Sequence, residues 1–214
     1  MLINNSSITS HMGGLDRLLA KSLDSTIRNN LGEKTTEKIE QRLVEKYGIN
    51  ITQGIEQFQK IDAVLREFFG AGADGLEKKF LENICKTKGK TKSNNWFTIE
   101  DTSIAQIILE SYGDEDKSKI MTAVSEDAKI ISEILADCKI PQTSGYRKIN
   151  SLIENGLLVT EGSIVSGDGR RVSKYRTLFD NTRINIVKNH ITVDVQLNRP
   201  NLNESSVLQV IFTS

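Results

Sequence analysis

The sequence has few cysteines and histidines and no long apolar run. It contains two cysteines, Cys85 and Cys138, and two histidines, His11 and His190. Neither cysteine has a second cysteine or a histidine at metal-ligand spacing, so a zinc site is not expected, and two separate thiols suit a reducing cytoplasm. Apolar runs reach about four residues, far below the roughly 20 of a membrane-spanning helix. We expect a cytoplasmic protein without metal sites or membrane spans.

Catalytic motifs are also scarce. The glycine-rich segment 70–75 follows a helical pattern, whereas a dinucleotide-binding loop follows a strand. His11 falls in a polar start of the chain, and His190 falls in a predicted hairpin turn. No serine, cysteine or carboxylate has a plausible partner that the sequence alone reveals. We therefore expect no enzymatic activity and no cofactor.

The formal net charge of +0 hides a separation of charge along the chain. Residues 98–135 carry nine acidic residues and three lysines, a net charge of −6. Residues 139–176 carry seven basic residues and three acidic ones, a net charge of +4. Local charge sets the field that a phosphate backbone meets, so residues 139–176 can bind nucleic acid despite the neutral total.

The N-terminal part of the chain is predicted to be helical. Residues 1–14 are polar and aperiodic, and we expect a disordered start. Residues 15–85 show apolar side chains at three- and four-residue steps, which indicates a small helical domain of four helices, the third carrying residues 55–69. Three glycines are placed to end the first three helices: Gly32, Gly48 and Gly70.

A change of composition follows this domain. Residues 86–95 contain four lysines on alternate positions and no apolar residue, which favours a solvated linker over a DNA-binding arm. Helical spacing returns at 104–153, and then the period changes to two, which predicts β-hairpins. Residues 96–197 have the order of a winged helix-turn-helix, and 198–214 form a polar tail with an apolar stretch at 207–212. The expected fold is mainly α with a small β part.

The helix that begins near Gln142 has the features of a recognition helix. A tight turn at 137–140 precedes it, and Pro141 stands where a missing N–H is harmless. We expect its buried side to hold Tyr146, Ile149, Leu152 and Ile153. Its DNA-binding side is expected to comprise Gln142, Thr143, Ser144, Arg147, Lys148 and Ser151. A solvated helix face is the plainer interpretation of these side chains, and the neighbouring turn and hairpin favour DNA binding.

A basic hairpin follows the recognition helix. The turn 166–169 joins strands at 157–165 and 171–179, and it carries one acidic residue, Asp168. Four basic residues are placed on or near its tip and are expected to contact the phosphate backbone or minor groove: Arg170, Arg171, Lys174 and Arg176. The alternative is a hairpin kept soluble by charge, as edge strands often are.

Segments 113–120, 140–149, 152–158 and 168–176 resemble archaeal ArsR-like winged-helix regulators, over about half of the chain. The resemblance implies that Ser144 opens the recognition helix, that Tyr146 packs beneath it and that Asp168 and Gly169 belong to the wing. Metal-sensing members use cysteine or histidine clusters, which this sequence lacks, so metal sensing is not implied.

Segments 27–32, 43–49 and 65–80 resemble the helical Nitrosopumilus output domain of ammonia-oxidising archaea. That resemblance implies signal transduction without a defined ligand. Together the two parts predict a transcriptional regulator that binds double-stranded DNA as a homodimer, with the helical domain controlling the winged helix. The alternative is a signalling adaptor whose winged helix docks onto a protein partner, for which the acidic residues between 100 and 127 would suit a basic surface.

Overall fold

A computed structural model describes residues 13–87 and 96–197, together with Ser205 and Val207. The predicted tail 198–214 and its apolar stretch 207–212 therefore lie largely outside the described residues. The helical half contains α1 (Gly14–Leu31), α2 (Glu33–Tyr47), α3 (Ile51–Glu56), α4 (Phe58–Phe69), the short 3-10 helix η1 (Gly70–Gly72) and α5 (Ala73–Glu82). No described helix is long and apolar enough to span a membrane.

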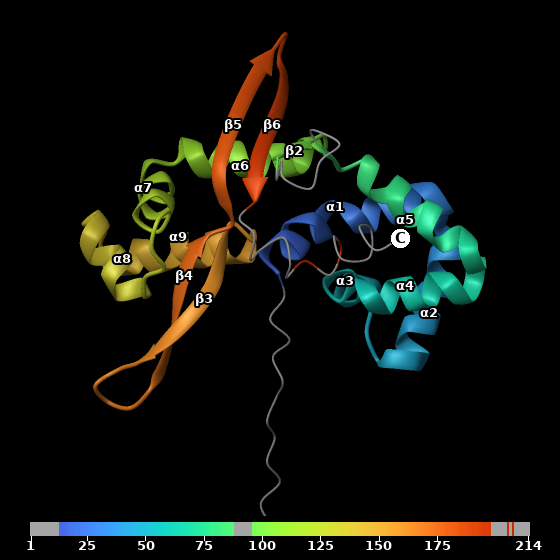
Figure 1. Ribbon diagram of the computed structural model, residues 1–214, viewed down its shortest axis with the longest axis horizontal. Coiled ribbons are helices and arrows are strands. Elements are labelled where there is room, and N and C mark those ends of the chain that lie inside the picture. The colour runs from blue at the N-terminus through green and yellow to red at the C-terminus, as the bar shows by residue number, and fades with distance from the viewer. Residues whose placement is uncertain (1–12, 88–95, 198–204, 206, 208–214) are drawn as a thin grey trace, which may run out of the picture.

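The second half begins with β1 (Cys85–Thr87) and β2 (Trp96–Ile99) and continues through four helices and two hairpins (Figure 1). The helices are α6 (Thr102–Gly113), α7 (Glu115–Ala123), α8 (Ile131–Cys138) and α9 (Gln142–Glu154). The strands are β3 (Leu158–Val165), β4 (Arg171–Thr177), β5 (Phe179–Val187) and β6 (His190–Leu197). A helical part followed by a winged helix-turn-helix arrangement with C-terminal hairpins confirms the expected fold class.

Local signals place the ends of several helices. The Asn50 side chain accepts from the backbone N–H of Gln53 at 2.8 Å, and the Gln53 side chain accepts from the N–H of Asn50 at 3.1 Å, which forms a capping box for α3. Asp101 caps α6 and Asp114 caps α7 through one side-chain contact each, accepting from the backbone N–H of Ile104 and of Lys117. The single helix expected at 55–69 is divided between two helices, because the helical conformation is interrupted at Gln57, between α3 and α4.

The strands form two antiparallel sheets. One has the order β1-β2-β6-β5, and the other is the two-stranded β3-β4 hairpin. In the β5-β6 hairpin, Lys188 and Asn189 both have positive φ, 49° and 64°, which fits a tight two-residue turn. The predicted linker 86–95 is wrong at its start, because Lys86 and Thr87 belong to β1 and pair with β2; residues 88–95 lie outside the described ones.

The two halves share one continuous set of buried apolar side chains. Helix α1 reaches across both: Leu18, Leu19 and Leu23 are fully buried, and Figure 1 shows α1 running from the foot of the hairpins into the helical half. The disordered start was expected to include residue 14, and this is wrong, because Gly14 is buried and is the first residue of α1. Residues 1–12 lie outside the described ones. Ser205 is buried and its hydroxyl donates to Asp16 of α1.

Candidate nucleic-acid interface

A tight turn joins α8 to α9. Helix α8 ends at Cys138, Lys139 takes the left-handed conformation with φ 54°, and Ile140 is buried beneath the turn. Gly145 of α9 faces α8 so closely that a Cβ atom there would lie 2.2 Å from Cδ2 of Leu135. The predicted tight turn is confirmed, and Gly145 lets the two helices approach each other.

The first turns of α9 present polar side chains to solvent. Gln142, Thr143 and Arg147 are exposed. Ser144 is half-buried, and its hydroxyl donates to the carbonyl of Pro141 at 3.1 Å. Asn150, which was not among the predicted residues, is also exposed; it follows Arg147 by three positions, a spacing that places both on the same side of a helix.

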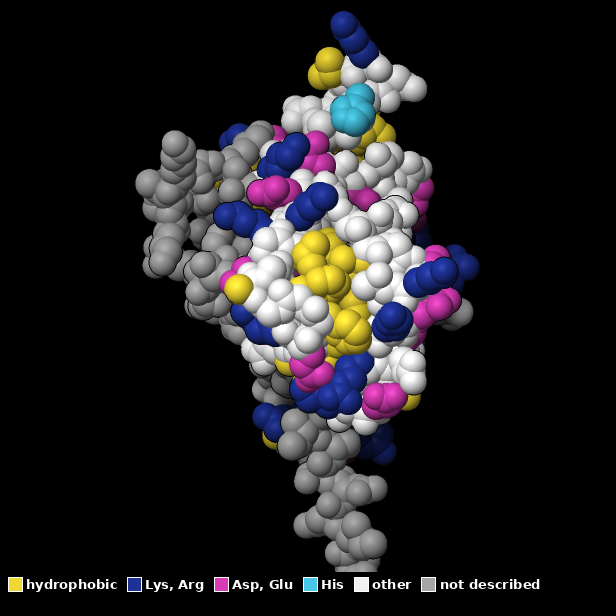
Figure 2. All heavy atoms as spheres, turned by 90° about the vertical axis from the view of Figure 1, so that its right-hand side faces the viewer, with side chains coloured by type: hydrophobic (Ala, Val, Ile, Leu, Met, Phe, Trp, Pro, Cys, Tyr) yellow, Lys and Arg dark blue, Asp and Glu magenta, His cyan; other side chains and the backbone are white. Residues whose placement is uncertain are grey.

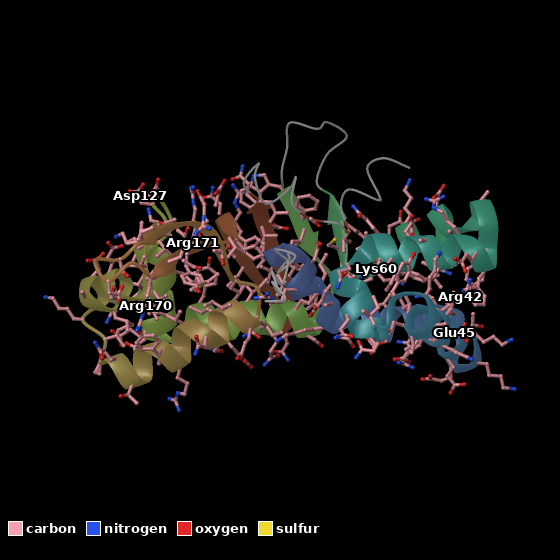
Figure 3. All side chains as sticks on the ribbon, turned by 90° about the horizontal axis from the view of Figure 1, so that it is seen from below. Arg42, Glu45, Lys60, Asp127, Arg170 and Arg171 are labelled. Carbon is pink, nitrogen blue, oxygen red and sulfur yellow. The ribbon has the colours of Figure 1, made fainter. Side chains whose placement is uncertain are left out.

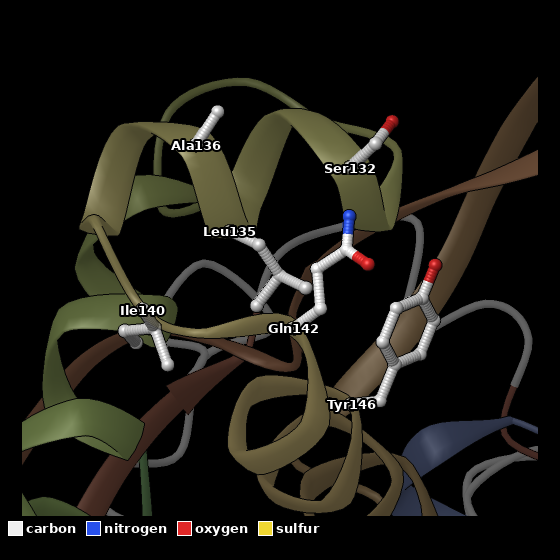
Figure 4. Close-up of a pocket in the computed structure, with 6 residues that line it drawn as sticks. All are labelled: Ser132, Leu135, Ala136, Ile140, Gln142 and Tyr146. Atoms are coloured by element: carbon white, nitrogen blue, oxygen red, sulfur yellow. The ribbon is translucent and has the colours of Figure 1, made fainter.

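Tyr146 was predicted to be buried, and this is wrong. Its side chain is 45% exposed, whereas Ile149 and Leu152 are fully buried and Ile153 is half-buried. Tyr146 lies at the edge of a small hollow of about 190 Å³ between α8 and the start of α9 (Figure 4). The hollow is lined by Ser132, Leu135, Ala136, Ile140, Gln142 and Tyr146. The exposed ring lies beside Gln142 at this hollow.

Lys148 was predicted to face the DNA groove, but its ammonium group is held inside the protein. Its Nζ lies 2.7 Å from Oδ1 of Asp114 and 3.1 Å from Oδ2 of Asp116, and the side chain is 18% exposed. The hydrogen bond from Lys148 holds the pKa of Asp114 below its usual value, and the same bond raises the pKa of Lys148. Lys148 therefore joins α9 to the start of α7.

Ser151 belongs to the same internal contact. Its hydroxyl accepts a hydrogen bond from Nζ of Lys117 at 3.1 Å, and it is half-buried. Lys117 lies on α7 beside Asp116, so this second contact joins α7 to α9 about one turn further along α9 than Lys148 does. The expectation that Ser151 faces DNA is corrected on this ground.

The wing is the β3-β4 hairpin. Of the four basic residues predicted on or near its tip, two lie there. Arg170 is 84% exposed in its side chain, with Nε 3.3 Å from Asp168, and Arg171 is exposed with Nε donating to Ser163 at 2.7 Å. Figure 3 shows both arginines at the end of the molecule opposite Arg42 and Lys60 of the helical half. The tip therefore offers two guanidinium groups to solvent.

The other two predicted wing residues lie further from the tip. Lys174 is half-buried on β4. Arg176 pairs with Val159 near the foot of the hairpin, is 25% exposed and lies 3.6 Å from Glu161. Its placement at the tip was wrong, because it lies five positions after Arg171 along the extended strand β4, which runs back toward the core.

Backbone hydrogen bonds hold the wing to the helices. Lys129, just before α8, and Tyr175 of β4 exchange two of them, at 3.0 and 2.8 Å. Such a pair ties β4 of the wing to the segment that precedes α8.

Comparisons with known proteins add no assignment. No family model, curated protein or solved structure matches the chain. The resemblances described above stay predictions, and the function rests on the residues and their arrangement.

Helix α1 connects the helical half to the end of α9. Arg17 donates through Nη1 to the carbonyl of Ile153 at 3.0 Å, and Lys21 donates to the side chain of Asn155. Gly156, with φ +75°, brings its backbone against Gly14 and Leu18 of α1. Helix α1 therefore packs against the C-terminal end of α9.

Proposed function

We propose that the chain is a sequence-specific regulator of transcription that binds double-stranded DNA. The observation that carries the proposal is the exposed N-terminal part of α9, with Gln142, Thr143 and Arg147, on the same body as the arginine-tipped wing. Amide and guanidinium side chains at the start of a helix are the groups that recognise base edges in the major groove. A cytoplasmic location goes with this role.

The internal contacts refine which residues serve it. Lys148, Ser151 and Arg176 are engaged within the protein, so the proposed base-reading group is Gln142, Thr143, Arg147 and Asn150, with Tyr146 beside it. Arg170 and Arg171 would contact phosphates. The helical half is proposed to control this surface through α1, which contacts the end of the recognition helix.

The direct test is selection of binding sites from a random duplex library with the full chain, followed by mobility-shift titrations of the selected duplex and a scrambled one at two salt concentrations. A regulator retains the selected duplex and loses affinity steeply as salt rises. Absence of any duplex binding would overturn the proposal and favour the alternative, a signalling adaptor that docks on a protein.

Removing the wing arginines should weaken binding to every sequence alike. Arg170→Ala and Arg171→Ala each delete one exposed guanidinium, and each lost phosphate contact lowers the slope of log affinity against log salt by about 0.9. The measurement is a salt titration of the parent and both variants on the selected and scrambled duplexes. Lys188→Ala, at the tip of the other hairpin, is the control and should keep the parent slope. An unchanged slope in both arginine variants would show that the wing does not contact DNA.

The active species is proposed to be a homodimer, because one recognition helix covers few base pairs and two symmetric copies would reach half-sites about 34 Å apart. Figure 2 shows hydrophobic side chains gathered on the end of the helical half, where charged side chains of both signs surround them. Phe68 of α4 is 42% exposed and its ring centroid lies 6.3 Å from that of Phe69.

Light scattering of the full chain is expected to give the mass of a dimer. Phe68→Asp would place a charge in an apolar contact between subunits, so the variant is expected to shift toward the monomer and to bind the full DNA site more weakly. Circular dichroism of the variant should match the parent, since Phe68 is not a core residue. A parent chain that is monomeric at micromolar concentration and binds DNA one to one would contradict the homodimer.

A further inference from the structure

Three carboxylates gather where α4 and α5 meet, far along the chain from the winged helix. Asp62 lies on α4, and Asp74 and Glu77 lie on α5 at a three-residue spacing that places them on the same side of that helix. Each offers a carboxylate oxygen, and these oxygens lie within 4.8 Å of one another. Like charges at such distances repel, so a positive group between them would stabilise the arrangement.

Glu77 makes this more than a surface cluster of acidic residues. It is 1% exposed, and neither of its carboxylate oxygens receives a hydrogen bond from a donor in the described part of the chain. An unpaired carboxylate buried in this way is costly unless something neutralises it. Burial, together with the neighbouring Asp62 carboxylate, raises the pKa of Glu77 to about 8.

One basic residue, Arg66, already contacts the cluster, but its single charge does not neutralise three carboxylates. Arg66 of α4 donates through Nε to Oδ1 of Asp62 at 2.6 Å and through Nη2 to Oδ1 of Asp74. Both contacts use Oδ1 and leave the second oxygen of each aspartate to other partners. With Glu77 ionised, the three carboxylates and Arg66 carry a net charge of −2, which one divalent cation would balance.

We propose that Asp62, Asp74 and Glu77 form a binding site for a hard divalent cation of the Mg²⁺, Mn²⁺ or Ca²⁺ class. Carboxylate oxygens are the ligands that these ions prefer. Entry is open from solvent, because the side chains of Asp62 and Asp74 are 21% and 41% exposed while Glu77 lies at the base of the cluster. The cation would join α4 to α5 across the η1 turn and so brace the helical half.

The experiment uses the full chain, freed of metal by chelation, in buffers of equal ionic strength with MgCl₂, MnCl₂, CaCl₂ or NaCl. Thermal unfolding is expected to move to higher temperature with at least one of the divalent ions and not with NaCl. At 100 times the dissociation constant, binding to the folded state alone should favour folding about 100-fold. Calorimetric titration is expected to give one ion per chain.

Two variants separate a bound cation from a nonspecific salt effect. Glu77→Gln removes the buried ligand charge while keeping its shape, so it should fold without metal at least as well as the parent and lose the divalent-ion shift. Glu82→Gln removes an exposed carboxylate from the same helix and should keep the parent shift. No shift with any of the three ions in the parent, or an equal shift in Glu77→Gln, would overturn the site and leave a proton on Glu77 as its neutralising partner.

Discussion

Replacing Gly156 with alanine is expected to lower the free energy of unfolding by at least about 3 kcal/mol. The backbone there has φ +75°, a conformation that costs an L-residue roughly 1–2 kcal/mol. The added Cβ would also lie 2.3 Å from the carbonyl oxygen of Gly14 and 2.9 Å from the N atom of Leu18, and backbone atoms cannot move aside as a flexible side chain can. Chemical denaturation of the parent and the variant measures the change.

Two other glycines separate these contributions. Gly162 has φ +77° with no atom within 4 Å of its Cβ position, so Gly162→Ala should show the conformational cost alone. Gly167 has neither a positive φ nor a close neighbour, so Gly167→Ala should be nearly neutral. If Gly156→Ala were no more destabilising than Gly162→Ala, the close packing of α1 against the end of α9 would be refuted.

The packing at Gly156 also decides how the two halves can be studied. Leu18 and Leu19 of α1 are fully buried in a core that continues into the winged helix. A fragment that begins after α5 would lack α1 and expose the apolar side chains that it covers. The control of the recognition helix by the helical half is therefore tested better by substitutions in the intact chain, such as Arg17→Ala, than by truncation.

Periodicity predicted the elements that depend on neighbouring residues alone. The apolar steps of α1 and α2, their glycine ends, the α8–α9 turn and both hairpins follow local rules and are present in the structure. The alternating period after residue 157 predicted the hairpins, and the β5-β6 hairpin is closed by Lys188 and Asn189, both with positive φ. The exposure of Arg147 and Arg170 was likewise predictable from helical spacing and from the hairpin tip.

The errors concern contacts between distant residues. Lys148 looked free because its partners, Asp114 and Asp116, lie more than 30 positions earlier. Tyr146 looked buried because it falls on the apolar side of α9, and helical spacing does not show whether another element covers the ring. The β1-β2 pairing joins segments on either side of a lysine-rich stretch, so composition alone could not reveal it. Glu77 gave no signal, since an acidic residue in a helix is usually exposed.

The contrast between Arg147 and Lys148 gives the sharpest functional prediction. They are neighbours on α9, yet Arg147 is exposed and Lys148 is held by Asp114 and Asp116 at the start of α7. Arg147→Ala should leave thermal unfolding unchanged and reduce discrimination between the selected and scrambled duplexes by about 1–3 kcal/mol, the worth of a good bidentate base contact. Arg147→Lys should restore the attraction to phosphates but not the discrimination between the two duplexes, because an ammonium group cannot donate the two parallel hydrogen bonds of a planar guanidinium.

Lys148→Ala should show the opposite pattern. The variant should unfold at a lower temperature, with a free energy of unfolding about 1 kcal/mol below that of the parent. The molecules that remain folded should keep their sequence preference. The loss should depend on pH. Because the pKa of Asp114 is lowered in the folded protein, its bond to Lys148 stabilises the fold above the unfolded-state pKa and is lost as pH falls through the folded-state value. The difference in melting temperature between parent and Lys148→Ala should therefore shrink in acid. A Lys148→Ala protein that melts like the parent at neutral pH and binds all duplexes equally would instead place Lys148 in the groove and undo the assignment of these two neighbours.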